Sequence, residues 1–97
     1  MKVRILRSAL EDLAAARKFY DRQSLTAGSS FFENLFAELD SLEHHAGIHR
    51  VCFGYHRLLA RRFPSAIYYR ISGQEVIVHR VLDCRRDPRW TYRQLKD

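Results

Sequence analysis

Arginine and tyrosine side chains gather in one segment, Tyr55–Trp90, which reads YHRLLARRFPSAIYYRISGQEVIVHRVLDCRRDPRW. Arginine stays charged at physiological pH, and its planar guanidinium pairs with phosphate or carboxylate oxygens through two parallel hydrogen bonds. Fixed positive charge attracts polyanions and acidic proteins, so the segment predicts a nucleic acid or an acidic protein as partner. The arginines expected to contact it are Arg57, Arg61, Arg62, Arg85, Arg86 and Arg89.

The positive charge is confined to the second half of the chain. Of the net charge of +6, residues 1–48 contribute −1, with six Lys and Arg against seven Asp and Glu. Residues 49–97 contribute +7, with eleven against four. Arginine accounts for 14 of the 17 basic residues. Solubility alone would not favour arginine over lysine, so this segregation supports the partner prediction.

Cysteine and histidine add little further chemistry. Cys52 and Cys84 lack the C-x-x-C spacing of redox and zinc sites and are expected to stay reduced. His45 and His49 are spaced i, i+4 without an evident third ligand, so neither a metal nor another cofactor is predicted. His79 lies in an apolar stretch, where a half-buried imidazole is more common than a catalytic one.

Length and composition predict one domain over residues 1–97. A chain of this size has room for one hydrophobic core, and an apolar content of 46% is typical of globular proteins. No apolar run approaches the roughly 20 residues of a membrane helix, and the N-terminus lacks the pattern of a signal peptide. We therefore expect a cytoplasmic protein.

Two helices are predicted in the first half. Ser8 and Glu11 have the spacing of a capping box, which predicts a helix opened by Ser8 with Asp12 in its first turn. The segment Asp21–Gly28 is expected to be a turn or linker, and a second capping signal follows at Ser30. The second helix carries an apolar stripe at helical spacing, formed by Phe32, Leu35, Phe36, Leu39 and Leu42.

The remaining sequence predicts strands. They are expected at Val3–Leu6, His56–Arg62, Ala66–Ile71 and Glu75–Leu82. Tyr68 and Tyr69 must point to opposite faces, so one is expected in the core and the other exposed. The tail, Asp87–Asp97, is expected to form no more than one helical turn. This order predicts an α+β fold, β-α-α-β-β-β, with two N-terminal helices packed on a small, mainly antiparallel sheet.

Short groups of residues follow one another along the chain in a distinctive order. They are Ala9-x-x-Asp12-Leu13-x-x-Ala16, Phe32, Arg62-Phe63-Pro64-x-x-Ile67-Tyr68-Tyr69-Arg70, Val76-x-Val78-x-x-Val81 and Arg85-Arg86-Asp87-Pro88. Their order and spacing resemble the RelE/ParE superfamily of bacterial toxins, of the plasmid stabilisation type. The resemblance runs from about Val3 to Trp90 and implies the same β-α-α-β-β-β fold.

The resemblance implies the toxin of a type II toxin–antitoxin system. ParE-like members bind DNA gyrase and inhibit it without a reaction of their own, whereas RelE-like members are endoribonucleases that cleave mRNA on the ribosome. A degenerate member without toxicity is a third alternative. In each case the implied partner is a cognate antitoxin, expected to be acidic and partly disordered, in a homodimer of toxins or a toxin–antitoxin heterotetramer.

RNA cleavage would need groups for both charge stabilisation and proton transfer. The candidates are Arg57, Arg61 and Arg85 for the phosphate, and His56, His79, Asp83 and Tyr92 for the proton. Many relatives have histidine where this chain has Asp83, and a carboxylate beside Arg85 and Arg86 would pair with them. The lysines that assist RelE also lack counterparts in the predicted sheet, so the gyrase alternative is favoured.

Four arginines are expected to converge at one end of the sheet. Arg57 and Arg61 would share a face of one strand, because side chains alternate along a strand. Arg85 and Arg86 would turn outward where Pro88 ends the last strand. Like charges this close repel, which indicates a surface that an anion visits.

Overall fold

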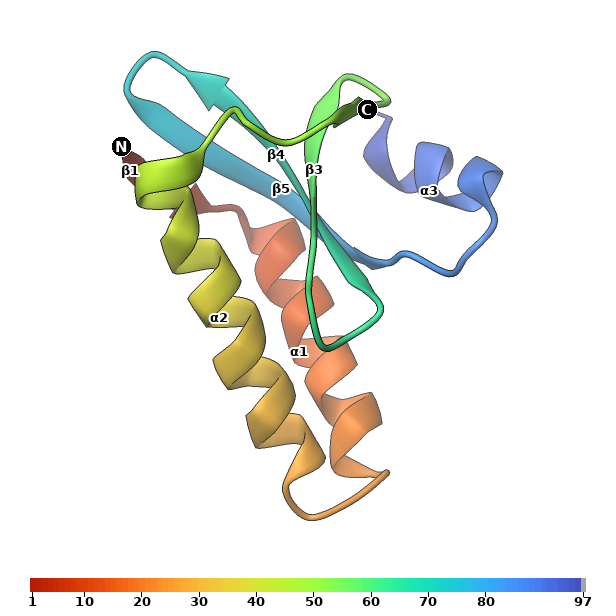
Figure 1. The fold of residues 1–97 in the computed structure, drawn as a ribbon. Coiled ribbons are helices and arrows are strands. Elements are labelled where there is room, and N and C mark those ends of the chain that lie inside the picture. Colours follow the sequence, from red (N-terminus) through yellow and green to blue (C-terminus); the bar gives the residue numbers. More distant parts are fainter. Residues whose placement is uncertain (97) are drawn as a thin grey trace.

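Residues 1–96, which the computed structural model describes, form two long helices, a five-stranded sheet and a third, shorter helix (Figure 1). The elements are β1 (Lys2–Ile5), α1 (Arg7–Asp21), α2 (Ala27–His45), β2 (Val51–Cys52), β3 (Tyr55–Leu59), β4 (Ser65–Ser72), β5 (Glu75–Asp83) and α3 (Pro88–Leu95). The predicted α+β fold is confirmed, with β2 and α3 as additions to it. None of the helices in these residues is long and apolar enough to cross a membrane.

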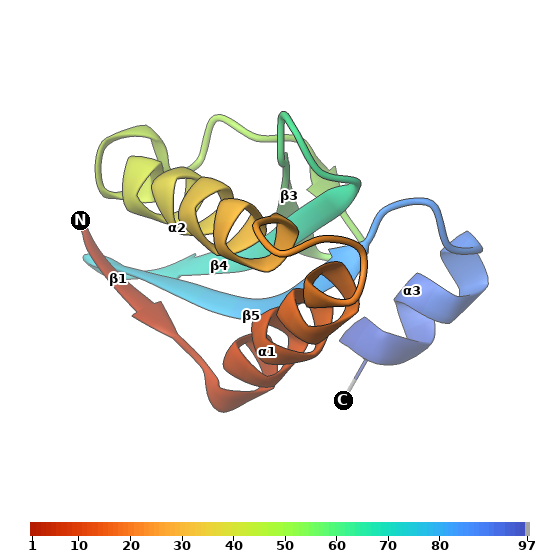
Figure 2. The same ribbon diagram turned by 90° about the horizontal axis from the view of Figure 1, so that it is seen from below.

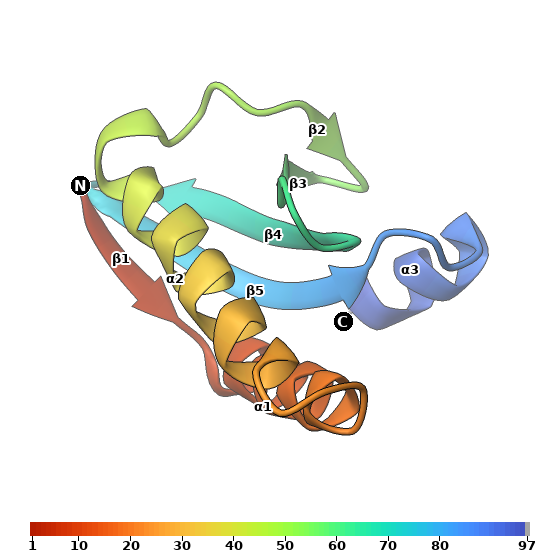
Figure 3. The same ribbon diagram turned by 60° about the horizontal axis from the view of Figure 1, so that its bottom comes forward.

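The sheet has the strand order β1-β5-β4-β3-β2, and only β1 runs parallel to its neighbour (Figure 3). Its pairing is interrupted in β5, where Tyr68 faces Arg80 but Tyr69 faces Val78. His79 is therefore an extra residue, a β-bulge, which shifts the alternation of the side chains that follow it. Val78 and Val81 consequently reach the same core although they are three residues apart.

Helices α1 and α2 cover one face of the sheet (Figures 2 and 3). The core between the two layers is built from Ala9 and Leu13 of α1, Phe31, Leu35, Leu39 and Leu42 of α2, and Leu58, Ile67, Tyr69, Val76, Val78 and Val81 of the sheet. Most of these side chains are fully buried, and this burial of apolar surface is the main favourable contribution to folding.

Helix α3 covers part of the opposite face, at the end of β5 (Figure 2). Leu95 packs there with Tyr55 and Tyr68, and the Tyr55 hydroxyl donates a hydrogen bond to the Leu95 carbonyl at 3.0 Å. Tyr68 and Tyr69 point to opposite faces but are both buried, with 2% and 0% exposure. The expectation that one of them is exposed is wrong, because α3 supplies a second core.

The start of α1 differs from the prediction. The helix begins at Arg7, and Leu6 is its extended N-cap residue, with φ −72° and ψ 158°. Ser8 is therefore inside the first turn, and its hydroxyl donates to the His79 carbonyl at 2.6 Å instead of capping the helix. The predicted capping box is wrong because β1 leads straight into the helix. Asp12 accordingly lies in the second turn rather than the first.

The apolar stripe of α2 is displaced by one residue at its N-terminal end. The helix starts at Ala27, before the predicted signal at Ser30, and the Ala27 N–H donates to the Ser24 hydroxyl at 3.1 Å. Phe31 is the fully buried residue, whereas Phe32 lies at the edge of the core. The Arg17 guanidinium lies 4.7 Å from the Phe32 ring centroid, so this ring contacts a cation as well as the edge of the core.

Two predicted boundaries in the second half are also wrong. Strand β3 ends at Leu59 instead of Arg62, so the following arginines lie in the connection to β4. The tail forms a helix of eight residues rather than one turn. Asp87 caps this helix by accepting the Arg89 N–H at 2.8 Å, and Pro88 occupies the first helical position, where no N–H is needed.

Candidate functional site

The arginines predicted to converge are divided among three places. Arg57 and Arg86 line one hollow at the α3 end of the sheet. Arg85 lines another, on the side of α1. Arg61 lies beside α2, next to Glu38. The predicted convergence is therefore wrong, because β3 ends before Arg61 and the alternation of a strand no longer applies there.

Arg61 and Arg62 belong to a third surface, beside α2. The Arg61 side chain is 89% exposed, and its Nε lies 3.9 Å from Glu38 Oε1. The Arg61 backbone N–H also donates to Glu38 Oε2 at 3.2 Å. The Glu38 carboxylate therefore holds the backbone of the turn more closely than it holds the Arg61 guanidinium. A long contact of this kind on the surface contributes little stability and leaves the arginine available to a partner.

Arg57 and Arg86 lie in a hollow of about 410 Å³, which we call the arginine groove. It is lined by Arg50, Val51, Cys52, Phe53, Arg57, Tyr68, Cys84, Arg86, Pro88 and Thr91. Arg57 Nε donates to the Tyr68 hydroxyl at 3.2 Å, and the Arg86 guanidinium lies 4.0 Å from the Trp90 ring centroid. These partners are neutral, and within residues 1–96 no Asp or Glu lines the groove, so these residues give it an uncompensated positive charge.

Asp83 and Arg85 form a closed pair on the α1 side. Arg85 Nε and Nη2 donate to the two carboxylate oxygens of Asp83 at 3.1 and 2.9 Å, and the Arg85 backbone N–H adds a bond of 2.8 Å. The hydrogen bonds from Arg85 hold the pKa of Asp83 below its usual range. An ionised carboxylate held in this way is a poor donor or acceptor of protons near neutral pH.

Arg89 and Tyr92 lie on α3 rather than on the sheet. Arg89 pairs with the cap residue Asp87, with Nη2 and Oδ2 at 2.9 Å, and these bonds lower the pKa of Asp87. Tyr92 is 51% exposed, and its ring centroid lies 5.7 Å from that of Phe53. This pair of exposed rings, which we call the aromatic step, adjoins the arginine groove at Phe53.

The histidines considered for proton transfer have structural surroundings. The His56 ring stacks on Tyr69 at 5.0 Å, and its Nδ1 lies 2.9 Å from the His49 carbonyl. His49 Nδ1 lies 2.5 Å from the Tyr69 hydroxyl, and burial lowers the pKa of His49. The His79 ring meets the edge of Tyr55 at 5.0 Å. Residues 1–96 contain no group of three or more His, Cys, Asp or Glu side chains arranged to hold a metal ion.

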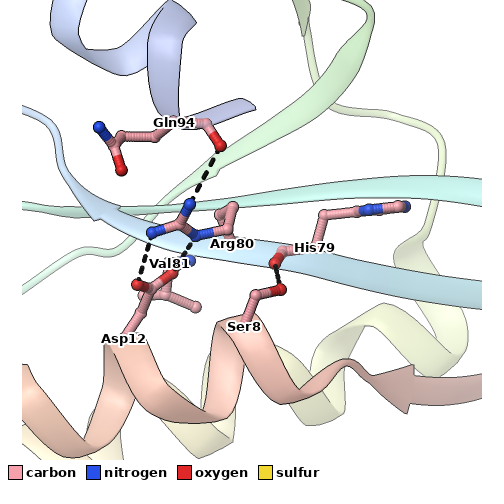
Figure 4. Close-up of polar contacts among 6 residues, drawn as sticks. All are labelled: Ser8, Asp12, His79, Arg80, Val81 and Gln94. Atoms are coloured by element: carbon pink, nitrogen blue, oxygen red, sulfur yellow. Dashed lines mark hydrogen bonds and ion pairs between the residues drawn. The ribbon is translucent and has the colours of Figure 1, made fainter. Parts of the chain in front are cut away.

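An ion pair that was not predicted from the sequence joins three elements (Figure 4). Arg80 of β5 donates to Asp12 of α1 through Nε at 2.7 Å and Nη2 at 2.9 Å, and through Nη1 to the Gln94 carbonyl of α3 at 3.0 Å. Asp12 Oδ2 also accepts the Val81 N–H at 2.9 Å. Two signals were available: an arginine inside an apolar strand, and Asp12 four residues after Ser8, on the same helix face. This contact fixes α1 and the C-terminal end of α3 against β5 rather than forming a reactive site.

Known proteins share both the sequence pattern and the fold of this chain. The family model described as "ParE toxin of type II toxin-antitoxin system, parDE" matches residues 3–88. A chain from the solved structure "Chromosomal ParDE TA system from P. aeruginosa" superimposes with a TM-score of 0.71 at 23% identity, covering 84% of this chain and 92% of that chain. At this identity the similarity shows the fold alone. A comparison with curated proteins finds no match. Since the family model covers far more than half of the sequence, the chain belongs to the ParE toxin family of type II toxin–antitoxin systems.

Proposed function

We propose that this chain is a cytoplasmic toxin that stops growth by binding DNA gyrase, with no reaction of its own, and that a cognate antitoxin neutralises it. Membership of the ParE toxin family supports the toxin–antitoxin part. The distribution of charge supports the partner, because the second half of the chain carries +7 and would attract an acidic, partly disordered segment. The assembly is either a homodimer of toxins or a toxin–antitoxin heterotetramer.

The pairing of Asp83 with Arg85 is the observation that carries the choice of binding over catalysis. Asp83 is kept ionised by three hydrogen bonds from Arg85, so it does not serve as a general acid at neutral pH. The arginines considered for the phosphate lie in three different places. A nuclease site would need them, and a proton-transfer group, around one phosphate. The endoribonuclease alternative is therefore disfavoured by the geometry.

The proposed contact residues for the antitoxin or the target are Arg57, Arg61, Arg62, Arg85, Arg86 and Arg89. They lie on three surfaces: the arginine groove with its adjoining aromatic step, the α1 side and the α2 side. This division suits a partner that wraps around the toxin better than one that occupies a single pocket. An extended acidic segment can reach all three, because a disordered chain covers a large surface when it folds on binding.

The test is a supercoiling assay with purified gyrase, combined with induction of the chain in cells. We expect loss of supercoiling, arrest of growth and rescue by co-expression of the acidic protein encoded beside it. Intact supercoiling together with cleaved mRNA on purified ribosomes would decide for the endoribonuclease. Harmless expression at a high level, with neither effect, would identify a degenerate member.

A further inference from the structure

The arginine groove and the aromatic step form one continuous surface at the α3 end of the molecule. The hollow at the aromatic step has a volume of about 460 Å³ and shares Phe53 and Pro88 with the arginine groove. Arg50, Arg57 and Arg86 line the first part, and Arg89 and Arg93 line the second. Within residues 1–96, no Asp or Glu lines either part, but Arg89 is paired with Asp87. Arg50, Arg57, Arg86 and Arg93 therefore supply most of the positive charge that would attract an anion.

Phe53 is held in a conformation that its side chain disfavours. Its φ is +56°, and among residues 1–96 it is the only residue other than glycine with a positive φ. It forms, with Gly54 at φ +82°, the two-residue turn between β2 and β3. Asn-Gly suits such a turn far better than an aromatic residue does. Backbone strain at an exposed position is a reason to look for a function of the side chain.

Arg70 holds the backbone of the turn in place. Arg70 Nε donates to the Gly54 carbonyl at 3.1 Å, and the Arg70 guanidinium lies 3.8 Å from the Tyr55 ring centroid. The Phe53 side chain is nevertheless 46% exposed, and Tyr92 beside it is 51% exposed. Rings that are open to this degree add little to the core and leave aromatic faces accessible.

We propose that the arginine groove and the aromatic step bind an unpaired DNA strand, with phosphates on the arginines and a base against Phe53 or Tyr92. The arginine guanidinium donates two parallel hydrogen bonds to phosphate oxygens, and aromatic rings stack on bases of any sequence. Bases inside a duplex are already stacked, so this surface selects an unpaired strand. A DNA strand has no 2′-OH to attack its own phosphate, so the strand is bound and not cleaved by the route considered for RNA.

The choice of DNA over RNA rests on the proposed function, because gyrase acts on DNA. The site is complete without gyrase or antitoxin, because all of its lining residues belong to this chain. Arg89, Tyr92 and Arg93 lie beyond residue 88, where the match to the family model ends. Three of the proposed contact residues thus belong to a segment that the family match does not include.

Binding can be measured on the purified chain without gyrase or antitoxin. Trp90 is the only tryptophan and lies against Arg86 of the groove, so its fluorescence reports on the site. The probe is an oligothymidylate of about ten nucleotides, within the range of about 4–16 that one small domain covers. We expect saturable binding, at least about tenfold weaker binding of a mixed-sequence duplex, and weaker binding of oligouridylate. No binding, equal binding of the duplex, or tighter binding of oligouridylate would overturn the proposal.

Three variants locate the site. Phe53→Gly keeps the turn and should weaken binding by about tenfold, as loss of one base stack predicts. The double variant Arg50→Ala with Arg93→Ala should reduce the dependence of log K on log salt by about 0.7 for each phosphate that is no longer neutralised. As a control, Arg22→Ala removes one positive charge at the far end of α1 and should bind as the wild type does. If the first two variants also bind as the wild type does, the proposal is wrong.

The two cysteines give an independent readout. Cys52 and Cys84 are free thiols and both line the arginine groove. Oligothymidylate should slow their reaction with iodoacetamide, and unchanged rates at saturation would place the strand elsewhere. The outcome is separable from the proposed function: gyrase inhibition without DNA binding refutes only this site, and DNA binding without gyrase inhibition refutes only the target.

Discussion

Arg80 and the arginines of the groove belong to the same half of the chain, but their surroundings differ. The Arg80 guanidinium is occupied on each side, by two oxygens of Asp12 and by the Gln94 carbonyl. Arg57 and Arg86 meet a tyrosine hydroxyl and a tryptophan ring instead, and no carboxylate lines their groove. The total charge of the chain does not distinguish the two cases. The presence of a carboxylate partner does: Arg80, paired with a carboxylate, stabilises the fold, whereas arginines without one can bind a partner.

Replacing Asp12 should have the largest effect on stability. Asp12→Asn removes the charge that Arg80 pairs with and weakens the acceptor of the Val81 N–H. The two side chains are only 15% and 24% exposed, so the remaining guanidinium stays partly desolvated. Discounting the values known for fully buried pairs, we expect a loss of about 2–4 kcal/mol in the free energy of unfolding. Urea unfolding followed by Trp90 fluorescence measures it.

The matched control for this variant is Arg85→Ala, which breaks a bidentate pair of similar geometry on the surface. Its urea midpoint should stay within error of the wild type, because an exposed pair gains little over water. A double-mutant cycle with Asp12→Leu and Arg80→Met gives the coupling energy directly. Equal urea midpoints for Asp12→Asn and Arg85→Ala would show that the Arg80–Asp12 pair stabilises the fold no more than an exposed pair does.

A smaller effect is expected at the Tyr69 hydroxyl. This group accepts the Gly47 N–H at 2.9 Å and lies 2.5 Å from His49 Nδ1, so it ties the end of α2 to the sheet. Tyr69→Phe keeps the ring in the core but leaves both groups without this partner. We expect a loss of about 1–2 kcal/mol. Faster amide exchange of Gly47 would locate the effect, and unchanged exchange would contradict the tie.

The same cluster should make stability depend on pH. Burial, with help from the neighbouring His56, lowers the pKa of His49 below its ordinary value of 6.5. The unfolded chain therefore binds a proton at a higher pH than the folded chain does, so stability is lost as pH falls below about 6.5. His49→Gln should flatten this part of the curve. The carboxylates Asp83 and Asp87 have pKa values lowered from 3.8, so their contribution is lost only in stronger acid.

Much of the fold could be predicted from the sequence, because periodicity records which face is buried. The stripe through Leu35, Leu39 and Leu42 predicts α2, and alternation predicts β4 and the long part of β5. The bulge at His79 was not predictable, since its only trace is a shift in alternation that the pairing with β4 makes visible. Features created by tertiary contacts are hidden from local patterns.

The candidate site was predicted by residue type but not by position. Arginine in Tyr55–Trp90 indicates an anionic partner, yet the sequence does not tell which guanidinium has a carboxylate from a distant element. Asp83 was correctly expected to pair with Arg85, because neighbours in sequence are neighbours in space. Glu38 beside Arg61 and Asp12 beside Arg80 come from helices far away in the chain. Local signals could mark Asp12 and Arg80 as unusual, but they could not show that the two residues pair.

Apart from the Arg85→Ala control, the smallest change in stability is expected for Phe53→Gly, which tests whether an open region is held for the fold or for a partner. Glycine adopts the φ of +56° without penalty, which should return about 1 kcal/mol of backbone strain. Removal of the Phe53 ring, which lies 5.7 Å from Tyr92 between centroids and is half exposed, should offset most of that gain. The net change should stay below about 1 kcal/mol, measured by urea unfolding.

A large destabilisation would mean that the Phe53 side chain is needed for the stability of the fold, as Arg80 is. If Phe53→Gly keeps its stability, the fold does not need the ring. Binding of a partner would then explain why an aromatic residue occupies a turn that favours Asn-Gly.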